Sequence, residues 1–596
     1  MNLIAEVWRV LTPRQRRWAV WAQALSIVMA FSTVVGIASI SPFFSVLGDP
    51  ELISRNRIFH WLYATCGFSS RRSFEIALGL AFMSVVLIAN AINAIGSYVM
   101  IRLSWRISTE LKSTLFREYL RRPYLFHATT HSAVLFNNII FKTSHVTNSI
   151  LQNGFSFVTN AITALFIILS VVIFKTTTGA AIVLALAGGY IAIYLLMRNR
   201  LLRAGQAQSR LSAEQTKIVN ESLGSIKEIL VLRNQEFFRD KFKQSSDAFA
   251  RAATHTQVVS QSPKQIMECA AVVGLVLVTL LAGRGDDSVG PLLGQLTFLG
   301  FAAYRLLPAL QQAFSAVVGI RSNQAGFASI APDLSAARKR TNTAGASDEL
   351  WRERPRKDIR LEQVSFRYQS DRPAAASELS LLIPAGAAVG FVGANGSGKT
   401  TLVDIIAGLL TPDSGRLEVD GIAIDDANRE SWQSRIAYVP QTVFLMDATI
   451  AQNIALGIAD DAIDRERLLA AAKLARLDEF VGTLPDGYDH LLGERGMRLS
   501  GGQRQRIGIA RALYTDASVL ILDEATNALD GLTEHELMAT LLGLRSGYTV
   551  ILIAHRLNSV RACDLIFELD NGKIVAHGTY RELLEDSESF RRLVNL

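Results

Sequence analysis

The chain changes character along its length. Long apolar runs dominate the first 325 residues, and short alternating segments follow them. About 20 consecutive apolar residues are needed to cross the roughly 30 Å of hydrocarbon in a bilayer. A buried core helix would explain any one such run, but six of them favour membrane spans. We predict six spans, over residues 18–47, 74–100, 150–174, 179–197, 266–282 and 289–320.

The connections between these runs alternate in length. Residues 101–149 and 198–265 form long, charged connections with helical patterns, whereas the links between spans 3 and 4 and between spans 5 and 6 are short. Long inner connections place both termini in the cytoplasm, and the basic excess of residues 101–149 agrees with the positive-inside rule.

The first external loop, residues 48–73, runs against that rule because it carries Arg55, Arg57, Arg71 and Arg72. It also contains the apolar-aromatic stretch 58–63. This stretch fits either a short helix that closes the loop or a surface helix that engages a lipid.

From residue 359 to the end, short strand-like segments alternate with helical patterns, which is typical of an α/β domain. Residues 326–358 lose the apolar runs and gain polar residues. We therefore predict an all-α transmembrane domain of six long helices over residues 1–325, a linker over 326–358 and an α/β domain over 359–596.

Composition supports a membrane protein. Hydrophobic residues make up 49% and charged residues 19% of the chain, below the ~25% usual for charged residues in soluble proteins. The net charge is +8, and many of the Arg and Lys residues flank apolar segments. Because there is no basic tail, we expect no nucleic-acid partner. Three scattered cysteines argue against a disulfide framework. No small-residue cleavage site follows the first apolar run, so we expect no removable signal peptide.

Residues 393–400, Gly-Ala-Asn-Gly-Ser-Gly-Lys-Thr, fit G-x-x-x-x-G-K-[ST] between an apolar run and a helical pattern. Glycines let backbone N–H groups face a phosphate, and the helix N-terminus adds partial positive charge. Lys399 can reach the β- and γ-phosphates, and the Thr400 hydroxyl can ligate Mg²⁺. On its own this loop predicts a P-loop NTPase domain that binds a nucleotide and Mg²⁺. Its predicted nucleotide contacts are Gly393, Asn395, Gly396, Ser397, Gly398, Lys399, Thr400 and Thr401.

A second apolar strand, residues 518–522, ends in Asp523 and Glu524. Asp523 can hold Mg²⁺, and Glu524 can orient and deprotonate the attacking water. Two carboxylates after a strand are a weak signal alone. Behind a phosphate loop they predict ATP hydrolysis.

Residues 499–505, Leu-Ser-Gly-Gly-Gln-Arg-Gln, resemble the signature of ATP-binding cassette (ABC) transporters. A hydroxyl and two glycines at a helix N-terminus make a second anion site. The resemblance implies that Ser500, Gly501, Gly502 and Gln503 close on the γ-phosphate bound to the opposite subunit. A second copy of the chain, in a homodimer, is then a required partner.

Other elements of that family follow in order. The resemblance implies that Tyr368 stacks on adenine and that Gln441 senses Mg²⁺ and water. It also implies that Asp530 communicates across the dimer and that His555 contacts the γ-phosphate. Glu524, Gln441 and His555 are then the catalytic residues, and Thr400, Gln441 and Asp523 are the Mg²⁺ ligands.

Six spans followed by the cassette resemble an ABC half-exporter. The resemblance implies that the second domain is an α/β P-loop ATPase domain that uses ATP and Mg²⁺. It also implies that the two long connections carry helices that dock onto the cassettes, near residues 122–138 and 218–222.

Residues 221–229 and 304–308 look most like those of bacterial lipid-linked oligosaccharide flippases. The resemblance implies a multi-pass translocase of the bacterial cytoplasmic (inner) membrane, in contact with membrane lipids, that flips a lipid-linked oligosaccharide or similar amphipathic lipid. The alternative is an exporter of peptides, drugs or another lipid or polysaccharide precursor. An importer is disfavoured because the spans and cassette are fused, and a non-transporting ABC ATPase because such proteins lack six spans.

Arg305 lies inside the sixth apolar run, where a charge is costly unless it faces water or a partner. It is either a cavity cation that meets an anionic group of the substrate, or part of an interhelical pair, or a cation that snorkels to the membrane interface. Glu268, near the start of the fifth span, is a candidate partner.

Overall fold

The structure divides into two compact units. One contains residues 1–122 and 129–344, and the other contains residues 123–128 and 345–596. The computed structural model describes residues 3–39, 43, 46–47, 52–68, 70–173, 177–282, 289–341, 354–369, 371–526, 531–543, 547–554 and 556–594.

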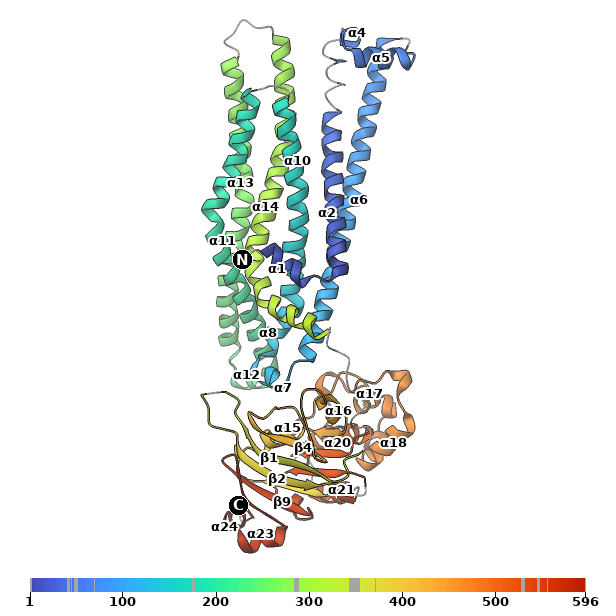
Figure 1. The fold of residues 1–596 in the computed structure, drawn as a ribbon, viewed down its shortest axis with the longest axis vertical. Coiled ribbons are helices and arrows are strands. Elements are labelled where there is room, and N and C mark those ends of the chain that lie inside the picture. Colours follow the sequence, from blue (N-terminus) through green and yellow to red (C-terminus); the bar gives the residue numbers. More distant parts are fainter. Residues whose placement is uncertain are drawn as a thin grey trace. The chain divides into compact units, whose positions relative to one another are not determined.

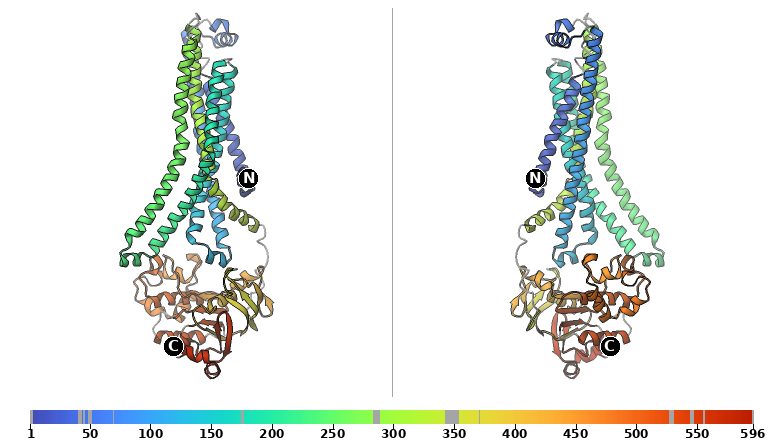
Figure 2. Two further views of the ribbon diagram at one scale, coloured as in Figure 1. Left: turned by 90° about the vertical axis from the view of Figure 1, so that its left-hand side faces the viewer. Right: turned by 90° about the vertical axis from the view of Figure 1, so that its right-hand side faces the viewer.

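The first unit is helical (Figure 1). Its long helices are α2 (Pro13–Ala38), α6 (Arg71–Leu120), α10 (Asn153–Ile173), α11 (Thr177–Gly224), α13 (Gln235–Ala282) and α14 (Val289–Thr341). Helix α2 packs along α6 and α10, α14 packs against α10 and α11, and α11 packs against α13. Both views of Figure 2 show α11 and α13 running side by side. The all-α first domain with six long helices is confirmed.

Part of this bundle is long and apolar enough to cross a membrane. Among the described residues, three stretches are long and apolar enough to span a bilayer: Pro13–Gly36, Arg71–Leu120 and Ser132–Leu169. The other three predicted spans lie in α11, α13 and α14 and include side chains outside the described set.

Helix α2 is described as far as Ala38, and the rest of the first predicted span includes residues 40–42 and 44–45, which lie outside the described residues. Residues 326–341, assigned to a linker from their polar composition, continue α14. That assignment was wrong because the apolar residues of this stretch are spaced at helical intervals and not in a run: Phe327, Ile330 and Leu334 are buried.

Short helices join the long ones. They are α1 (Leu3–Val10), α4 (Leu52–Arg55), α5 (Arg57–Thr65), α7 (Tyr124–Thr129), α8 (Ser132–Asn137), α9 (Thr143–Val146) and α12 (Ile226–Leu232), with π-helical turns η1 (Asn138–Lys142) and η2 (Thr147–Gln152). The apolar-aromatic stretch of the first loop is helix α5, beside the start of α6 (Figure 1). Tyr63 and Phe68 pack on Phe74 of α6 with ring centroids 5.5 and 5.3 Å away, while Ile58 and Trp61 are exposed.

Side-chain hydrogen bonds hold the long helices together. Asn93 of α6 donates to the Thr33 hydroxyl of α2 at 2.9 Å. Tyr190 of α11 donates to the Gln311 side chain of α14 at 3.1 Å, and Gln311 donates to the Ser260 carbonyl of α13 at 2.8 Å. In an apolar bundle such bonds tie helices to each other.

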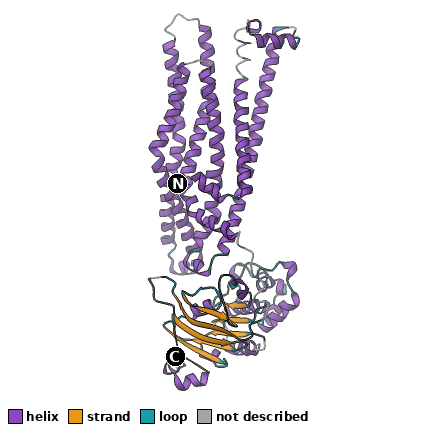
Figure 3. Cartoon of the chain, in the orientation of Figure 1, coloured by secondary structure: helices purple, strands orange, loops and turns teal. Residues whose placement is uncertain are grey.

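The strands lie in the second unit, as Figure 3 shows in orange. One antiparallel sheet has the order β2-β1-β4-β5, with β1 (Asp358–Phe366), β2 (Ala376–Pro384), β4 (Ser414–Val419) and β5 (Ile422–Ala423). The other sheet has the order β10-β9-β3-β8-β7-β6, with β3 (Ala388–Val392), β6 (Ile436–Val439), β7 (Val519–Asp523), β8 (Thr549–Ile553), β9 (Leu565–Asp570) and β10 (Lys573–Gly578). The helices of this unit are α15 (Lys399–Ile406), α16 (Arg429–Gln433), α17 (Ile450–Ile454), α18 (Arg465–Leu474), α19 (Asp478–Gly482), α20 (Gly501–Tyr514), α21 (Gly531–Gly543), α22 (Leu557–Val560), α23 (Tyr580–Asp586) and α24 (Glu588–Val594).

The second sheet is buried on both faces, which explains the unbroken apolar runs of β3, β7 and β8. On one face Phe391 and Ile521 pack with α15 and the antiparallel sheet, and on the other Val392 and Leu522 pack with α20 and α21. The α/β class predicted for the second domain is confirmed.

Residues 123–128 belong to this second unit by their contacts. Leu125 packs against the core that contains Phe391 and Trp432. Burial raises the pKa of Tyr124, with smaller effects from Asp404 and other groups nearby. This segment overlaps the first predicted docking helix.

Candidate nucleotide-binding site

Parallel strands bring the motifs to one edge of the sheet. β3 pairs in parallel with β8, and β8 pairs in parallel with β7. The phosphate loop follows β3, and Asp523 and Glu524 stand at the end of β7. Because the carboxyl ends of parallel strands meet at one edge, segments more than 100 residues apart converge there.

The phosphate loop needs its glycines. Gly393 and Gly398 have φ of 144° and 102°, a region that side chains rarely adopt. A Cβ on Gly393 would lie 2.1 Å from the Leu569 carbonyl oxygen, and one on Gly398 would lie 2.5 Å from that of Ala375. The loop therefore fits against its neighbours only with glycine at these positions.

Lys399, the first residue of α15, folds back onto the loop. Its Nζ donates to the carbonyl oxygens of Gly393 and Ala394 at 2.8 and 2.9 Å. Burial lowers the pKa of Lys399, and Glu524 and Asp523 partly offset this effect. The ammonium group is thus held where the loop would present a phosphate.

The two carboxylates are held separately. Tyr438 of β6 donates its hydroxyl to Asp523 Oδ2 at 2.9 Å. Gln441 donates its amide nitrogen to Glu524 Oε2 at 2.6 Å. Glu524 has φ of 50°, which is uncommon for a residue with a side chain. Strained backbone of this kind is found at functional sites, where the surrounding structure holds it.

Most of the predicted contacts surround one cavity of about 680 Å³, a volume suited to a small-molecule ligand. Its lining residues are Tyr368, Ala375, Asn395, Gly396, Gly398, Lys399, Thr400, Thr401, Gln441 and Glu524. The Tyr368 hydroxyl lies 3.2 Å from that of Thr401. Gly393, Ser397 and Asp523 are outside this lining, and the Ser397 hydroxyl is buried without a hydrogen-bond partner. A phosphate oxygen would satisfy that hydroxyl.

The donor set fits Mg²⁺. The Asp523 carboxylate, the Thr400 hydroxyl and the Gln441 side-chain oxygen are the hard oxygen ligands that this ion prefers, and few protein ligands are needed when phosphates complete the shell. Bound there, Mg²⁺ would neutralise charge that develops on the phosphates.

The signature residues form a separate helix start. Ser500 Oγ accepts from the Gln503 backbone nitrogen at 3.2 Å, and the Gln503 side chain accepts from the Ser500 backbone nitrogen at 2.8 Å. This capping box opens α20 with Gly501 and Gly502 in its first turn. None of these four residues lines the cavity beside Lys399. Asp530 and His555 lie outside the described residues.

Two residues near this site carried no predicted role. Burial, with a smaller contribution from Asp523, raises the pKa of Asp404 on α15 to about 6. Tyr438 orients Asp523, and burial raises its pKa. The alternation of buried and partly buried residues in β6 makes Tyr438 recognisable as a strand residue. No local feature of the sequence pairs it with Asp523.

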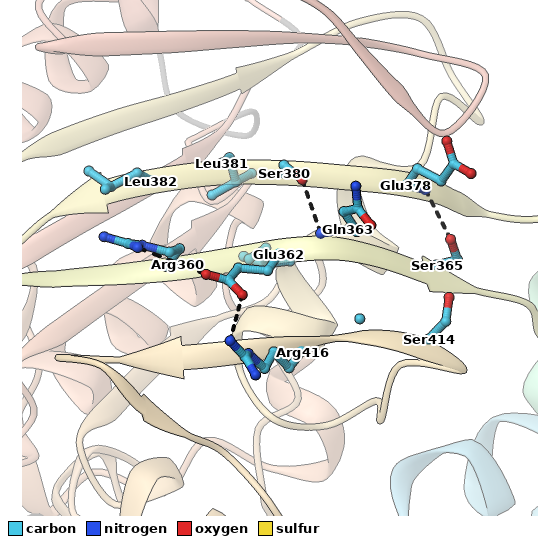
Figure 4. Close-up of a pocket in the computed structure, with 12 residues that line it drawn as sticks. Arg360, Glu362, Gln363, Ser365, Glu378, Ser380, Leu381, Leu382, Ser414 and Arg416 are labelled. Atoms are coloured by element: carbon cyan, nitrogen blue, oxygen red, sulfur yellow. Dashed lines mark hydrogen bonds and ion pairs between the residues drawn. The ribbon is translucent and has the colours of Figure 1, made fainter.

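Another hollow lies on the outer face of the antiparallel sheet (Figure 4). Several of its polar groups pair with each other. Arg416 contacts Glu362 at 2.8 Å, Gln363 donates its backbone nitrogen to Ser380, and Glu378 donates its backbone nitrogen to Ser365. The phosphate loop is elsewhere, so this hollow is not the nucleotide site.

The charges predicted inside the bundle do not pair with each other among the described residues. Glu268 lies 3.8 Å from Lys264, one turn away on α13, and both side chains are about half exposed. Arg305 is partly buried, its Nε has no hydrogen-bond partner, and its guanidinium lies 6.0 Å from the Tyr304 ring centre. Glu268 as the partner of Arg305 is therefore wrong in this structure.

Comparison with known proteins agrees with both units. Residues 19–305 match the model of the ABC transporter transmembrane region, and residues 376–527 match that of the ABC transporter. A protein of Albidiferax ferrireducens named ATP-dependent lipid A-core flippase is 30% identical over 587 residues, 97% of this chain and 98% of its own. One of the same name from Ralstonia nicotianae is 32% identical over 494 residues, 82% of each chain.

A solved structure of a bacterial Atm1-family ABC exporter with ATP bound has the same fold, with a TM-score of 0.76. It is 22% identical and the match covers 97% of each chain. The resemblance inferred from the signature residues is confirmed. The chain belongs to the ABC transporter family, as an exporter in which ATP hydrolysis drives transport across a membrane.

Proposed function

We propose that two copies of this chain form an ATP-driven flippase for an amphipathic lipid, such as a lipid-linked oligosaccharide or a lipid A-core molecule. The observation that carries the cargo class is the near full-length similarity to a protein named ATP-dependent lipid A-core flippase. The proposed setting is the bacterial cytoplasmic membrane, with both termini and the ATPase domains in the cytoplasm.

The separation of the site into two halves supports the proposed homodimer. Lys399 and Glu524 line one cavity, while the anion-binding start of α20 at Ser500 is not part of that lining. A second copy would bring its α20 to the phosphates that Lys399 holds. Helix α12 adds an exposed apolar surface, at Leu230, Val231 and Leu232, that suits a protein contact.

Each residue then has a task in hydrolysis. Lys399 exchanges its two loop carbonyls for the β- and γ-phosphates of ATP. Glu524, held by Gln441, accepts the proton of the attacking water. Loss of the γ-phosphate removes the group that both subunits contact. The two ATPase domains then separate, and the spans return to the arrangement that they had before ATP bound. Asp530 and His555 complete the site by family resemblance.

Arg305 is the proposed substrate contact. A cation inside an apolar helix is costly unless it faces water or an anion. In this structure its Nε is buried without a partner. An anionic group on an amphipathic lipid would supply that partner.

The test is reconstitution in liposomes with a fluorescent lipid-linked oligosaccharide, a lipid A-core molecule, a drug and a peptide as candidates. Translocation and stimulated ATPase activity are read together, with Glu524→Gln as the control without turnover. We expect a lipid to be moved and to stimulate hydrolysis. Movement of the drug or peptide alone would replace the proposed cargo with the alternative.

A further inference from the structure

Glu534 is a buried carboxylate outside the nucleotide cavity. It lies in the first turn of α21 and is 9% exposed. Glutamate is seldom buried to this extent unless its charge is paired. The residues that pair it therefore indicate what it does.

Three donors converge on this carboxylate. Oε1 accepts from the hydroxyls of Thr526 at 2.9 Å and Ser559 at 2.7 Å. Oε2 accepts from Arg556 Nη1 at 3.0 Å. Hydrogen bonds to an ionised acceptor are about twice as strong as neutral ones.

The donors come from the two segments that leave the nucleotide site. Thr526 is two residues after Glu524, so its bond to Glu534 joins the segment after β7 to the first turn of α21. Arg556 directly follows His555, and Ser559 lies on α22. Glu524, Thr526, Arg556 and Ser559 also line one small cavity.

We propose that Glu534 is a positioning residue for ATP hydrolysis. It ties Thr526, in the segment after Glu524, to Arg556 and Ser559, in the segment after β8, and so holds the backbone from which the base projects. It touches neither nucleotide nor water and acts through its three donors. A displacement of about 1 Å at a reacting group can cost about 100-fold in rate. The inference rests on the proposed role of Glu524 as base.

The experiment uses the full-length chain in lipid nanodiscs. ATPase kcat and KM, equilibrium ATP affinity and the melting temperature are measured for Glu534→Gln. The amide keeps the shape but loses the charge that Arg556 needs. We expect kcat to fall about tenfold, while ATP affinity and melting temperature stay near those of the wild type.

A matched control lies on the same helix. Glu536 is exposed and pairs with Arg476 at 2.6 Å on the surface. Glu536→Gln should leave kcat unchanged, because exposed ion pairs contribute little. Equal losses in the two variants would overturn the proposal.

Single-donor variants keep the test decisive if Glu534→Gln does not fold. Thr526→Val and Ser559→Ala should each lower kcat at unchanged ATP affinity. Where Glu534→Gln folds, Thr526→Val and Ser559→Ala should each lower kcat less in that background than in the wild type, since the effects of contacting residues are not additive. A wild-type kcat in Glu534→Gln, full additivity, or loss of ATP affinity in step with kcat would each overturn the inference.

Glu524→Gln separates this inference from its premise. If that variant keeps turnover, the base assignment fails, and the positioning role fails with it. If it loses turnover while Glu534→Gln does not, only the positioning role fails.

Discussion

Gln441 donates a hydrogen bond of 2.6 Å from its side-chain amide to Oε2 of Glu524. The two residues follow β6 and β7, which are parallel neighbours in the sheet. Both also line the cavity beside Lys399. Glu524 is thus held on one side by an amide and faces the nucleotide cavity on the other, an arrangement suited to a base that receives a proton only when water enters with ATP.

The first prediction concerns Glu524→Gln. An amide cannot take the proton of the attacking water, and general-base catalysis contributes typically 10²–10⁴-fold. ATPase turnover should fall by about that factor while ATP still binds, so a nucleotide-bound dimer accumulates. Turnover assays together with cross-linking measure both effects. Glu479→Gln, on the exposed start of α19, is the control that should behave as wild type. Wild-type turnover in Glu524→Gln would refute its assignment as base.

The second prediction concerns Tyr438→Phe. This change removes the hydroxyl that Asp523 accepts at 2.9 Å and little else. Partners that orient a metal-binding carboxylate typically matter by about 10–100-fold in metal affinity or activity. The Mg²⁺ concentration for half-maximal ATPase activity should rise accordingly, read from titrations at saturating ATP. Tyr488→Phe, outside the cavity, supplies the comparison. An unchanged Mg²⁺ dependence would show that Asp523 needs no orientation by Tyr438.

The third prediction follows from Asp404, whose pKa burial and Asp523 raise from 3.8 to about 6. Between these values the folded state binds more protons than the unfolded state, so stability falls as pH rises through the window. Above pH 6 the buried charge destabilises the fold by about 1–3 kcal/mol.

Asp404→Asn removes that charge. The melting temperature of the full chain should therefore rise relative to the wild type at pH 7.5, and this advantage should vanish near pH 4. Asp478→Asn, an exposed acid, should show no such crossover. A constant difference at every pH would contradict the raised pKa.

Much of the site could be predicted because its motifs are contiguous. The spacing from Gly393 to Lys399 predicts the phosphate loop without tertiary information, and a buried parallel strand explains why Asp523 follows four apolar residues. The α/β class and the helical first unit follow in the same way from the change of apolar period along the chain.

The rest depends on contacts between distant segments. Tyr438 and Asp523 are 85 residues apart and meet only because β6 and β7 are neighbours. In the sequence, Glu534 is an ordinary acidic residue in the first turn of a helix. Only the folded structure buries it among three hydrogen-bond donors. The linker boundary failed for a different reason. The continuous apolar run stops near residue 325, whereas α14 continues to Thr341 with buried apolar residues only at helical intervals, such as Phe327, Ile330 and Leu334.

The fourth prediction concerns Arg305, the proposed contact for an anionic group of the substrate. Arg305→Ala should abolish lipid translocation in liposomes and the lipid-stimulated part of ATPase activity. The reason is that the buried Nε of Arg305 has no hydrogen-bond partner within the described part of the protein, so we assign that place to the lipid. Basal ATPase activity should persist, since the nucleotide cavity lies in the other unit. Lys264→Ala, which removes a half-exposed cation paired with Glu268, should leave transport intact. If Arg305→Ala transports lipid at the wild-type rate with unchanged basal activity, the anion-binding role is wrong. Arg305 would then be only a packed cation of α14.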